Sequence, residues 1–328
     1  MPDFYPFDEA IYDLADDVLT EDALRDALAL GFRQIALNAR PDWDDAARQV
    51  RESGLGLIAR LPFGEDAPED ADALILCAGP GDEAALEKAL DESDLPVAVE
   101  WNEVSGFPED LPATRLLPLD RYALNRALRP RNRVDFARYM DALDAAQEWD
   151  ALTSPGCLTD ALLRLRPEDF EACGDLPQKA LLLLHMTLTG TPILRRGEEY
   201  GLPTEALPEA LRPRTAPASP ASPASQRQDP NSLWYWTRDL IALRREMPSL
   251  QFGGFQMIEN DRAIAYARVE QDAASGCIIA VNFSRRKVRM PGVAEVILSN
   301  TNRFYFDGML LPYEAAVLEA FYEDEEEE

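Results

Sequence analysis

The stretch QKALLLLHMTLTGTPILRRGEEYG, residues 178–201, is the most informative part of the sequence about the fold. Residues 178–189 form an apolar run long enough for a buried helix, and Thr191–Arg196 reads as a short strand after a Gly-Thr-Pro turn. A buried helix that leads directly into a strand is typical of α/β folds, in which helices connect parallel strands. We therefore expect the sequence before residue 178 to alternate between strands and helices.

The first 160 residues repeat such a pattern: an apolar run typical of a β-strand, a turn and an amphipathic helix. We expect each crossover to be a βα unit. The predicted strands are Ile11–Leu14, Gln34–Asn38, Leu55–Leu61, Asp72–Cys77, Pro96–Trp101, Thr114–Leu119, Trp149–Thr153 and Thr191–Arg196. Eight parallel strands is the number in a closed (β/α)8 TIM barrel.

Helices are predicted from amphipathic runs and their capping residues. Thr20 is expected to cap a helix that ends at Leu30, and Asp42 a helix that ends near Gly54. Further helices are expected at residues 82–90, 134–147, 178–189 and 232–245.

The pattern changes near residue 250. Short alternating strands follow at Ala263–Val269, Cys277–Asn282 and Ala315–Leu318, which is typical of an antiparallel β-sandwich. We therefore predict a barrel at residues 1–250, a C-terminal β-sandwich at 251–322 and an acidic, disordered tail at 323–328. Residues 203–230 hold a Pro/Ala/Ser-rich run and are expected to form an exposed, mobile loop.

The charge composition argues against several classes of partner. The chain has 60 acidic and 32 basic residues and a formal net charge of −28. Nucleic acids and anionic membranes are therefore disfavoured as partners. We expect a cytoplasmic protein, because the N-terminus lacks a basic, apolar leader and no apolar run is long enough to span a bilayer.

Cysteine and histidine are sparse. Cys77, Cys157, Cys173 and Cys277 lie far apart, and His185 is the only histidine. This spacing argues against disulfides and against a Cys/His zinc site, so we expect no metal, no cofactor and buried thiols. His185 is expected to pack in the core, because it lies within the apolar helix.

Three segments resemble the α-amylase family, glycoside hydrolase family 13. Residues 178–201 are similar to the family's passage from barrel helix seven to strand eight, with its GTP turn and GEE-type ending. Asp229–Leu233 and Trp236–Leu250 look like its last barrel helix, and Ile279–Ser284 and Leu311–Leu318 like its C-terminal sandwich. The resemblance implies an α/β chain, a TIM barrel followed by a β-sandwich, that lacks the family's inserted domain after strand three.

The resemblance also implies where catalytic carboxylates would stand. The family places a nucleophilic Asp after strand four, an acid/base Glu after strand five and a supporting Asp after strand seven. Here these positions correspond to Cys77, Glu100 and Gly156, and Ile75 stands where the family has the arginine partner of its nucleophile. Glu100 is therefore the only candidate acid, and a retaining mechanism would lack its nucleophile.

Other candidate site residues remain open. Asp72, Glu103 and Asp120 are carboxylates that could partner Glu100, with a solvated surface role as the alternative. Cys77 could be a reactive thiol instead of a buried one. Trp43, Trp101 and Trp149 are candidate sugar-stacking residues at the barrel mouth, with ordinary packing as the alternative.

These observations favour a non-catalytic relative of the α-amylase family, with a carbohydrate-binding or protein-interaction role. One alternative is an active α-glucosidase or glucanotransferase with rearranged carboxylates that uses Glu100. A second alternative is a structural assembly subunit whose acidic surface contacts a basic protein partner.

Overall fold

The computed structural model describes residues 6–15, 19–79, 81–101, 114–118, 151–154, 173–201, 222–260, 262–270, 276–290 and 292–320. Of residues 15, 101, 114–118 and 151–154 it describes the backbone only. The predicted helix at 134–147 and the acidic tail at 323–328 lie outside these ranges. Within them, no helix combines the length and the apolar character needed to cross a membrane.

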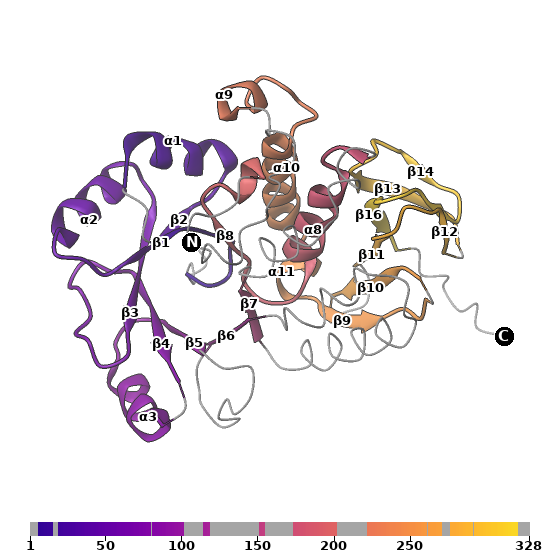
Figure 1. Ribbon diagram of the computed structural model, residues 1–328. Coiled ribbons are helices and arrows are strands. Elements are labelled where there is room, and N and C mark those ends of the chain that lie inside the picture. Colours follow the sequence, from indigo (N-terminus) through magenta and orange to yellow (C-terminus); the bar gives the residue numbers. More distant parts are fainter. Residues whose placement is uncertain are drawn as a thin grey trace, which may run out of the picture.

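The N-terminal part contains an eight-stranded sheet whose neighbouring strands are all parallel (Figure 1). Its strands are β1 (Ile11–Ala15), β2 (Gln34–Asn38), β3 (Gly56–Pro62), β4 (Ala73–Ala78), β5 (Val97–Trp101), β6 (Thr114–Pro118), β7 (Ala151–Ser154) and β8 (Ile193–Arg195). The order in the sheet is β7-β6-β5-β4-β3-β2-β1-β8. The last strand thus returns to pair with the first, as in a (β/α)8 barrel, and all eight strands coincide with predicted ones.

Successive side chains of each strand point to opposite faces of the sheet, and each face has its own apolar layer. One face of the sheet gathers Ile11, Ala36, Ile58, Ala73, Ile75, Ala98 and Ile193 with Phe7 into a small buried cluster. The opposite face contributes residues such as Tyr12, Leu37 and Leu57 to the main core under the helices. Because successive side chains point to opposite faces, the register fixes which polar residues share the small cluster's side.

The helices of the N-terminal part are α1 (Glu21–Leu30), α2 (Trp43–Glu52) and α3 (Glu83–Glu92). The predicted cap of α1 is confirmed, because the backbone N–H of Ala23 donates to Thr20 Oγ1 at 3.2 Å. The predicted side-chain cap of α2 is wrong. Asp42 stands at the N-cap position but makes no capping hydrogen bond, since its carboxylate instead accepts two hydrogen bonds from Arg40.

One crossover departs from the predicted βα pattern. The connection between β3 and β4, residues 63–72, contains no helix. Its sequence, FGEDAPEDAD, has two acidic pairs around Pro68 and no apolar stripe, so a helix there could bury nothing against the sheet. The link instead runs beside α2, where Arg51 pairs with Asp70 at 3.4 Å.

The last part of the predicted loop at residues 203–230 is mostly exposed, as predicted, but it departs from the prediction in two respects. α9 (Pro223–Gln226) is a short helix, and Gln226 is buried. The Gln226 side chain donates to the Tyr200 carbonyl at 2.9 Å, and Arg227 Nε donates to Tyr200 Oη. These contacts fix the chain to η1 (Glu198–Tyr200). The remainder of the loop lies outside the described residues.

Two long helices lie between the parallel sheet and the antiparallel C-terminal strands (Figure 1). They are α8 (Leu176–Thr187) and α10 (Leu233–Glu246), which is followed by α11 (Pro248–Phe252). Nearly every residue of α8 is buried, because it packs on α10 on one side and on the C-terminal sheet on another. The predominantly apolar sequence of α8 predicted this burial.

The C-terminal part is antiparallel throughout. Its strands are β9 (Gly254–Met257), β10 (Ile264–Val269), β11 (Gly276–Val281), β12 (Val288–Arg289), β13 (Ala294–Ser299), β14 (Tyr305–Phe306), β15 (Met309–Leu310) and β16 (Ala315–Glu319). Six form a sheet in the order β14-β13-β16-β11-β10-β9, and β12 pairs with β15. A buried cluster that includes Ala265, Ala280, Val288 and Leu310 joins the two sheets. The three predicted strands are confirmed, and the other five were not predicted.

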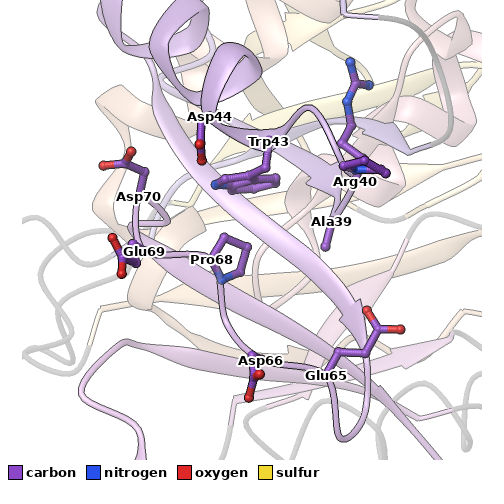
Figure 2. Close-up of a pocket in the computed structure, with 10 residues that line it drawn as sticks. Ala39, Arg40, Trp43, Asp44, Glu65, Asp66, Pro68, Glu69 and Asp70 are labelled. Atoms are coloured by element: carbon purple, nitrogen blue, oxygen red, sulfur yellow. The ribbon is translucent and has the colours of Figure 1, made fainter.

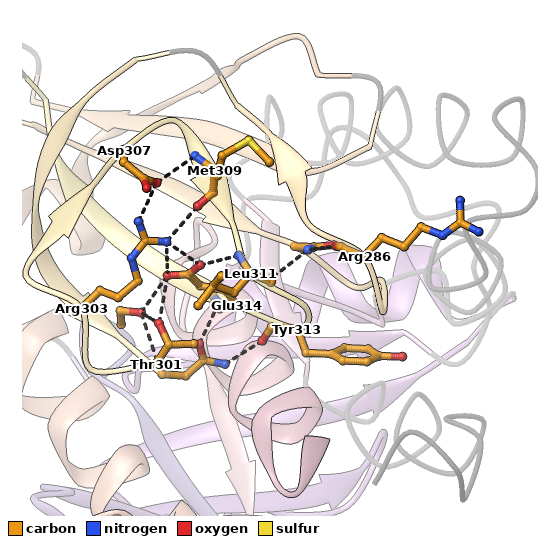
Figure 3. A network of polar contacts seen from close by, with 12 residues as sticks. Arg286, Thr301, Arg303, Asp307, Met309, Leu311, Tyr313 and Glu314 are labelled. Carbon is orange, nitrogen blue, oxygen red and sulfur yellow. Dashed lines mark hydrogen bonds and ion pairs between the residues drawn. The ribbon is translucent and has the colours of Figure 1, made fainter. Parts of the chain in front are cut away.

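A polar network holds the connections of this part (Figure 3). The almost fully buried Glu314 accepts hydrogen bonds from Arg303 at 3.0 Å, from Thr301 at 2.9 Å and from the Leu311 backbone at 2.6 Å. Arg303 also donates to Asp307 at 2.7 Å. A buried carboxylate with this many donors is satisfied, so the network orders the turns between β13 and β16.

Two buried arginines donate hydrogen bonds to carbonyl groups at the C-terminal end of α8. Arg244 of α10 donates to the carbonyls of Met186, at 2.8 Å, Leu188 and Gly190. Arg268 of β10 donates to the Thr187 carbonyl at 3.2 Å. The last carbonyls of a helix have no partner within the helix, and they carry partial negative charge. The two guanidinium groups therefore connect the end of α8 to α10 and to the C-terminal sheet.

We predict that Arg244→Met lowers the free energy of unfolding by about 2 to 4 kcal/mol, because it removes the donor of two buried carbonyls and one partly buried carbonyl. Urea denaturation measures the loss. The control is Arg25→Met, which removes an exposed i,i+3 ion pair with Asp22 and is expected to cost less than about 0.5 kcal/mol. Equal losses in the two variants would contradict this account.

Candidate functional site

Polar side chains form one layer near the carboxyl ends of six strands. They are Asp13 of β1, Asn38 of β2, Arg60 of β3, Cys77 of β4, Glu100 of β5 and Arg195 of β8. The strand register pairs Asp13 with Arg195, Asn38 with Arg60 and Cys77 with Glu100. Each residue stands two positions after a member of the small apolar cluster, so all six face the same side of the sheet. We call this set the mouth layer.

Arg60 is the centre of the mouth layer. Its Nη1 donates to both carboxylate oxygens of Asp13, at 2.8 and 3.0 Å, and its Nε lies 3.2 Å from Glu100 Oε2. Asp13 and Arg60 are almost completely buried, with side chains 1% and 10% exposed. Among the described residues, the mouth layer contains two carboxylates, those of Asp13 and Glu100. The Arg60 guanidinium contacts both.

Cys77 is adjacent to the only candidate acid. Its Sγ donates to Glu100 Oε2 at 3.7 Å. Burial, together with the Glu100 carboxylate, raises the pKa of the Cys77 thiol to about 11. A thiol attacks only as the thiolate, so Cys77 is a poor nucleophile at neutral pH. Glu100 Oε2 thus has two polar neighbours among the described residues, the Cys77 thiol and Arg60 Nε.

The structure brings together some of the predicted site residues and separates others. Cys77 and Glu100 are neighbours, and Ile75 packs in the apolar cluster below them. Asp72 lies at the amino end of β4, where it accepts a hydrogen bond from the Leu57 backbone at 2.7 Å, so it is not a partner of Glu100. The predicted positions of Glu103, Asp120, Trp149, Cys157 and Gly156 fall outside the described residues, as does the Trp101 side chain.

Trp43 is 6% exposed and lies at the start of α2, so its ring does not offer an open stacking face. His185 is buried in α8, as predicted, and its Nε2 lies 3.3 Å from the Ile193 carbonyl. Burial lowers the pKa of His185 to about 3, so the ring is neutral at physiological pH. Neither residue reaches the mouth layer.

Glu199 is buried behind the end of β8. It accepts hydrogen bonds from Tyr12 Oη and from the Gly197 backbone, both at 2.7 Å. Burial raises the pKa of Glu199 to about 7. The residue connects β1 to the turn after β8, which is a structural role.

Sequence reasoning missed Asp13, Arg60 and Arg195. A signal for the first two existed, because each is a charged residue within an otherwise apolar strand, in IYDLA and GLIARLP. A charge in a buried strand requires a partner. That rule identifies such residues, but it cannot say that Asp13 and Arg60, on strands separated by β2, would be each other's partner. Among the described residues, no group of three His, Cys, Asp or Glu side chains is placed to hold a metal ion.

Comparison with solved structures identifies the architecture. A trehalulose synthase in complex with Tris aligns with a TM-score of 0.65 and 15% identity over 95% of this chain and 99% of its own. The isomaltulose synthase of Erwinia rhapontici, in complex with D-glucose, aligns with a TM-score of 0.66 and 13% identity over 95% and 98%. The chain shares the fold of these enzymes.

A further structure of the trehalulose synthase, with its substrate sucrose, aligns with a TM-score of 0.63 and 14% identity. The likeness at this identity concerns the fold, in agreement with the strand order around β8 and β1. No model of a protein family matches the sequence, and no curated protein does.

We predict that Cys77 reacts with iodoacetamide roughly 100-fold more slowly than free cysteine at pH 8, because its raised pKa leaves little thiolate. Labelling followed by peptide mass spectrometry measures the rate at this position. Glu100→Gln removes the neighbouring negative charge, so it should accelerate the reaction. Labelling of the unsubstituted protein at the rate of free cysteine would be the contrary result.

Glu199 gives a pH dependence of stability. Its pKa is about 7 in the folded protein and 4.5 ordinarily, so the folded state holds the proton more tightly. This group's contribution is complete below about pH 4.5 and is lost as the pH rises to 7. Relative to Glu199→Gln, the unsubstituted protein should lose up to about 3 kcal/mol between pH 4.5 and 7.5. Urea denaturation at both pH values tests this; parallel pH profiles would refute it.

Proposed function

We propose that this chain is a minimal, non-catalytic member of the α-amylase family that binds carbohydrate or a protein partner in the cytoplasm. The observation that supports this most is the position of Arg60, which pairs with both Asp13 and Glu100. The proposal includes a closed barrel at residues 1–250, a β-sandwich at 251–322 and a disordered tail at 323–328. The short β3–β4 link, residues 63–72, supports the absence of an inserted domain.

Glycoside hydrolysis needs two carboxyl groups on either side of the scissile bond, about 5 to 5.5 Å apart in retaining enzymes and about 6.5 to 9.5 Å apart in inverting ones. In the mouth layer the Arg60 guanidinium lies between the carboxylates of Asp13 and Glu100 and pairs with both. Asp13 is almost fully buried and is also 3.7 Å from Arg195. A carboxylate in this setting cannot approach an anomeric carbon.

The mouth layer still offers groups that suit a polyol. The Glu100 and Arg195 side chains are 27% and 29% exposed, more than the other charged residues of the layer. A carboxylate accepts hydrogen bonds from sugar hydroxyls, and a guanidinium donates to them. Binding without turnover is therefore the function that these side chains favour, with Glu100 as acceptor and Arg195 as donor.

We predict that the purified protein does not hydrolyse or isomerise sucrose, maltose or an aryl α-glucoside. Isothermal titration with maltose, trehalose, sucrose and maltooligosaccharides should detect binding. Glu100→Gln and Arg195→Met should each weaken it about 10-fold, since each removes one charge-assisted contact. Arg25→Met serves as the matched control for loss of a surface charge.

Turnover that disappears in Glu100→Gln would overturn the proposal and favour an active glycosidase with rearranged carboxylates. Absence of both turnover and sugar binding would remove the carbohydrate role. A specific co-purifying basic protein would then favour the interaction or assembly role.

A further inference from the structure

A basic loop follows β11 in this strongly acidic chain. The segment RRKVR, residues 285–289, places four cations in five positions, whereas the whole chain has 32 basic residues among 328. All four basic residues are exposed, and Figure 3 shows the Arg286 side chain extending away from the polar network around Glu314. In the described part of the chain, Arg286, Lys287 and Arg289 have no ion-pair partner. We call residues 285–289 the basic loop.

Hydrogen bonds hold the backbone of the basic loop in place and bring a fifth cation beside it. The fully buried Asn282 donates from its side chain to the Arg286 carbonyl at 2.8 Å. The Arg289 carbonyl accepts from Asn260 at 3.2 Å, and Asn260 Oδ1 accepts from the backbone of the exposed Arg262 at 3.0 Å. Like charges held this close repel one another, so an anionic segment that lies across them is stabilised.

The two ends of the C-terminal sheet differ in charge. β10 and β16 end where β11 begins, because β11 is antiparallel to both. Glu270 and the exposed Glu319 stand at that end. The basic loop and Arg262 lie at the opposite end, where β11 ends and β10 begins. Carboxylates also lie close together on the β3–β4 link of the N-terminal part (Figure 2), so the basic loop departs from the general character of the chain.

We propose that the acidic run at residues 323–328 of the same chain binds the basic loop. The run supplies six consecutive carboxylates, which complement the unpaired cations of the loop. Runs of five or six like charges do not pack on themselves and often act as interaction tails. The contact is electrostatic and requires no regular structure in the run. It does not depend on sugar binding at the mouth layer.

The length of the connection permits this contact within one chain. Glu319, the last residue of β16, lies opposite Cys277 at the start of β11. From Cys277 to Asn282, which holds Arg286, the strand advances about 17 Å at about 3.4 Å per residue. The nine residues from 320 to 328 span up to about 30 Å when extended. A tethered segment has a high local concentration, so the run of the same chain is favoured over that of a second copy.

The test is cross-linking of the full chain with a carbodiimide, which joins an amine directly to a carboxylate in contact with it. The chain has only three lysines, Lys88, Lys179 and Lys287, so peptide mass spectrometry assigns each product. We expect Lys287 to be joined to residues 323–328. Lys88, which pairs with Glu92 at 3.6 Å, is the internal control for the reaction. A mixture of unlabelled and ¹⁵N-labelled protein shows whether the product forms within one chain.

Arg286→Gln with Arg289→Gln keeps Lys287 and removes two neighbouring cations, so it should lower the yield of the Lys287 product about 5-fold. The matched control is Arg25→Gln with Arg48→Gln, which removes two exposed cations of α1 and α2 and should leave the yield unchanged. Circular dichroism establishes that each variant is folded.

Three results would overturn the proposal. The first is a Lys88 product without a product that joins Lys287 to residues 323–328. The second is a Lys287 product of mixed isotope label, which would assign the run to a second copy. The third is an equal loss of yield in both double variants, which would mean that the run senses net charge alone.

Discussion

The Arg60 guanidinium is the interaction on which the carboxyl end of the sheet depends. A charge on an interior face of a sheet is tolerated only when its partners are also inside, and Arg60 finds Asp13 on β1 and Glu100 on β5. Removing Arg60 would leave Asp13 almost fully buried without its two shortest charge contacts. Among the described residues, Asp13, Arg60 and Glu100 therefore form one connected group of charges at the carboxyl end of the sheet.

The end of α8 is the second point at which distant segments meet. Arg244 comes from α10 and Arg268 from the C-terminal sheet, yet both donate to carbonyls between residues 186 and 190. The Thr187 hydroxyl adds a contact with Tyr266 Oη at 2.6 Å. Because α8 leads directly into β8, its fixed end also sets where β8 meets β1. The short stretch that predicts the fold is thus also the joint between the two parts of the chain.

The mouth layer and the β3–β4 link accommodate their carboxylates in different ways. In the mouth layer, buried charges satisfy one another, so little is left for a ligand beyond Glu100 and Arg195. The carboxylates of the link, residues 63–72, are exposed to solvent, and the link brings no arginine of its own. A chain with many carboxylates and few basic residues can neutralise them only where the fold places an arginine within reach, and here the fold does so for Asp13 but not for Glu69.

Local signals were enough to predict all eight parallel strands, the capped α1, the buried α8 and the change to antiparallel strands after residue 250, because periodicity and capping depend on residues close together in the chain. The family resemblance added that Cys77 and Glu100 stand at the ends of two consecutive strands. Neither source predicts the helix-free link at residues 63–72, the absence of a side-chain cap at Asp42 or the burial of Trp43, because each depends on what packs alongside. The bridge that Arg60 makes between β1 and β5 is visible only in the folded chain. Charges far apart in sequence choose partners by distance and burial, and these exist only once the sheet has formed.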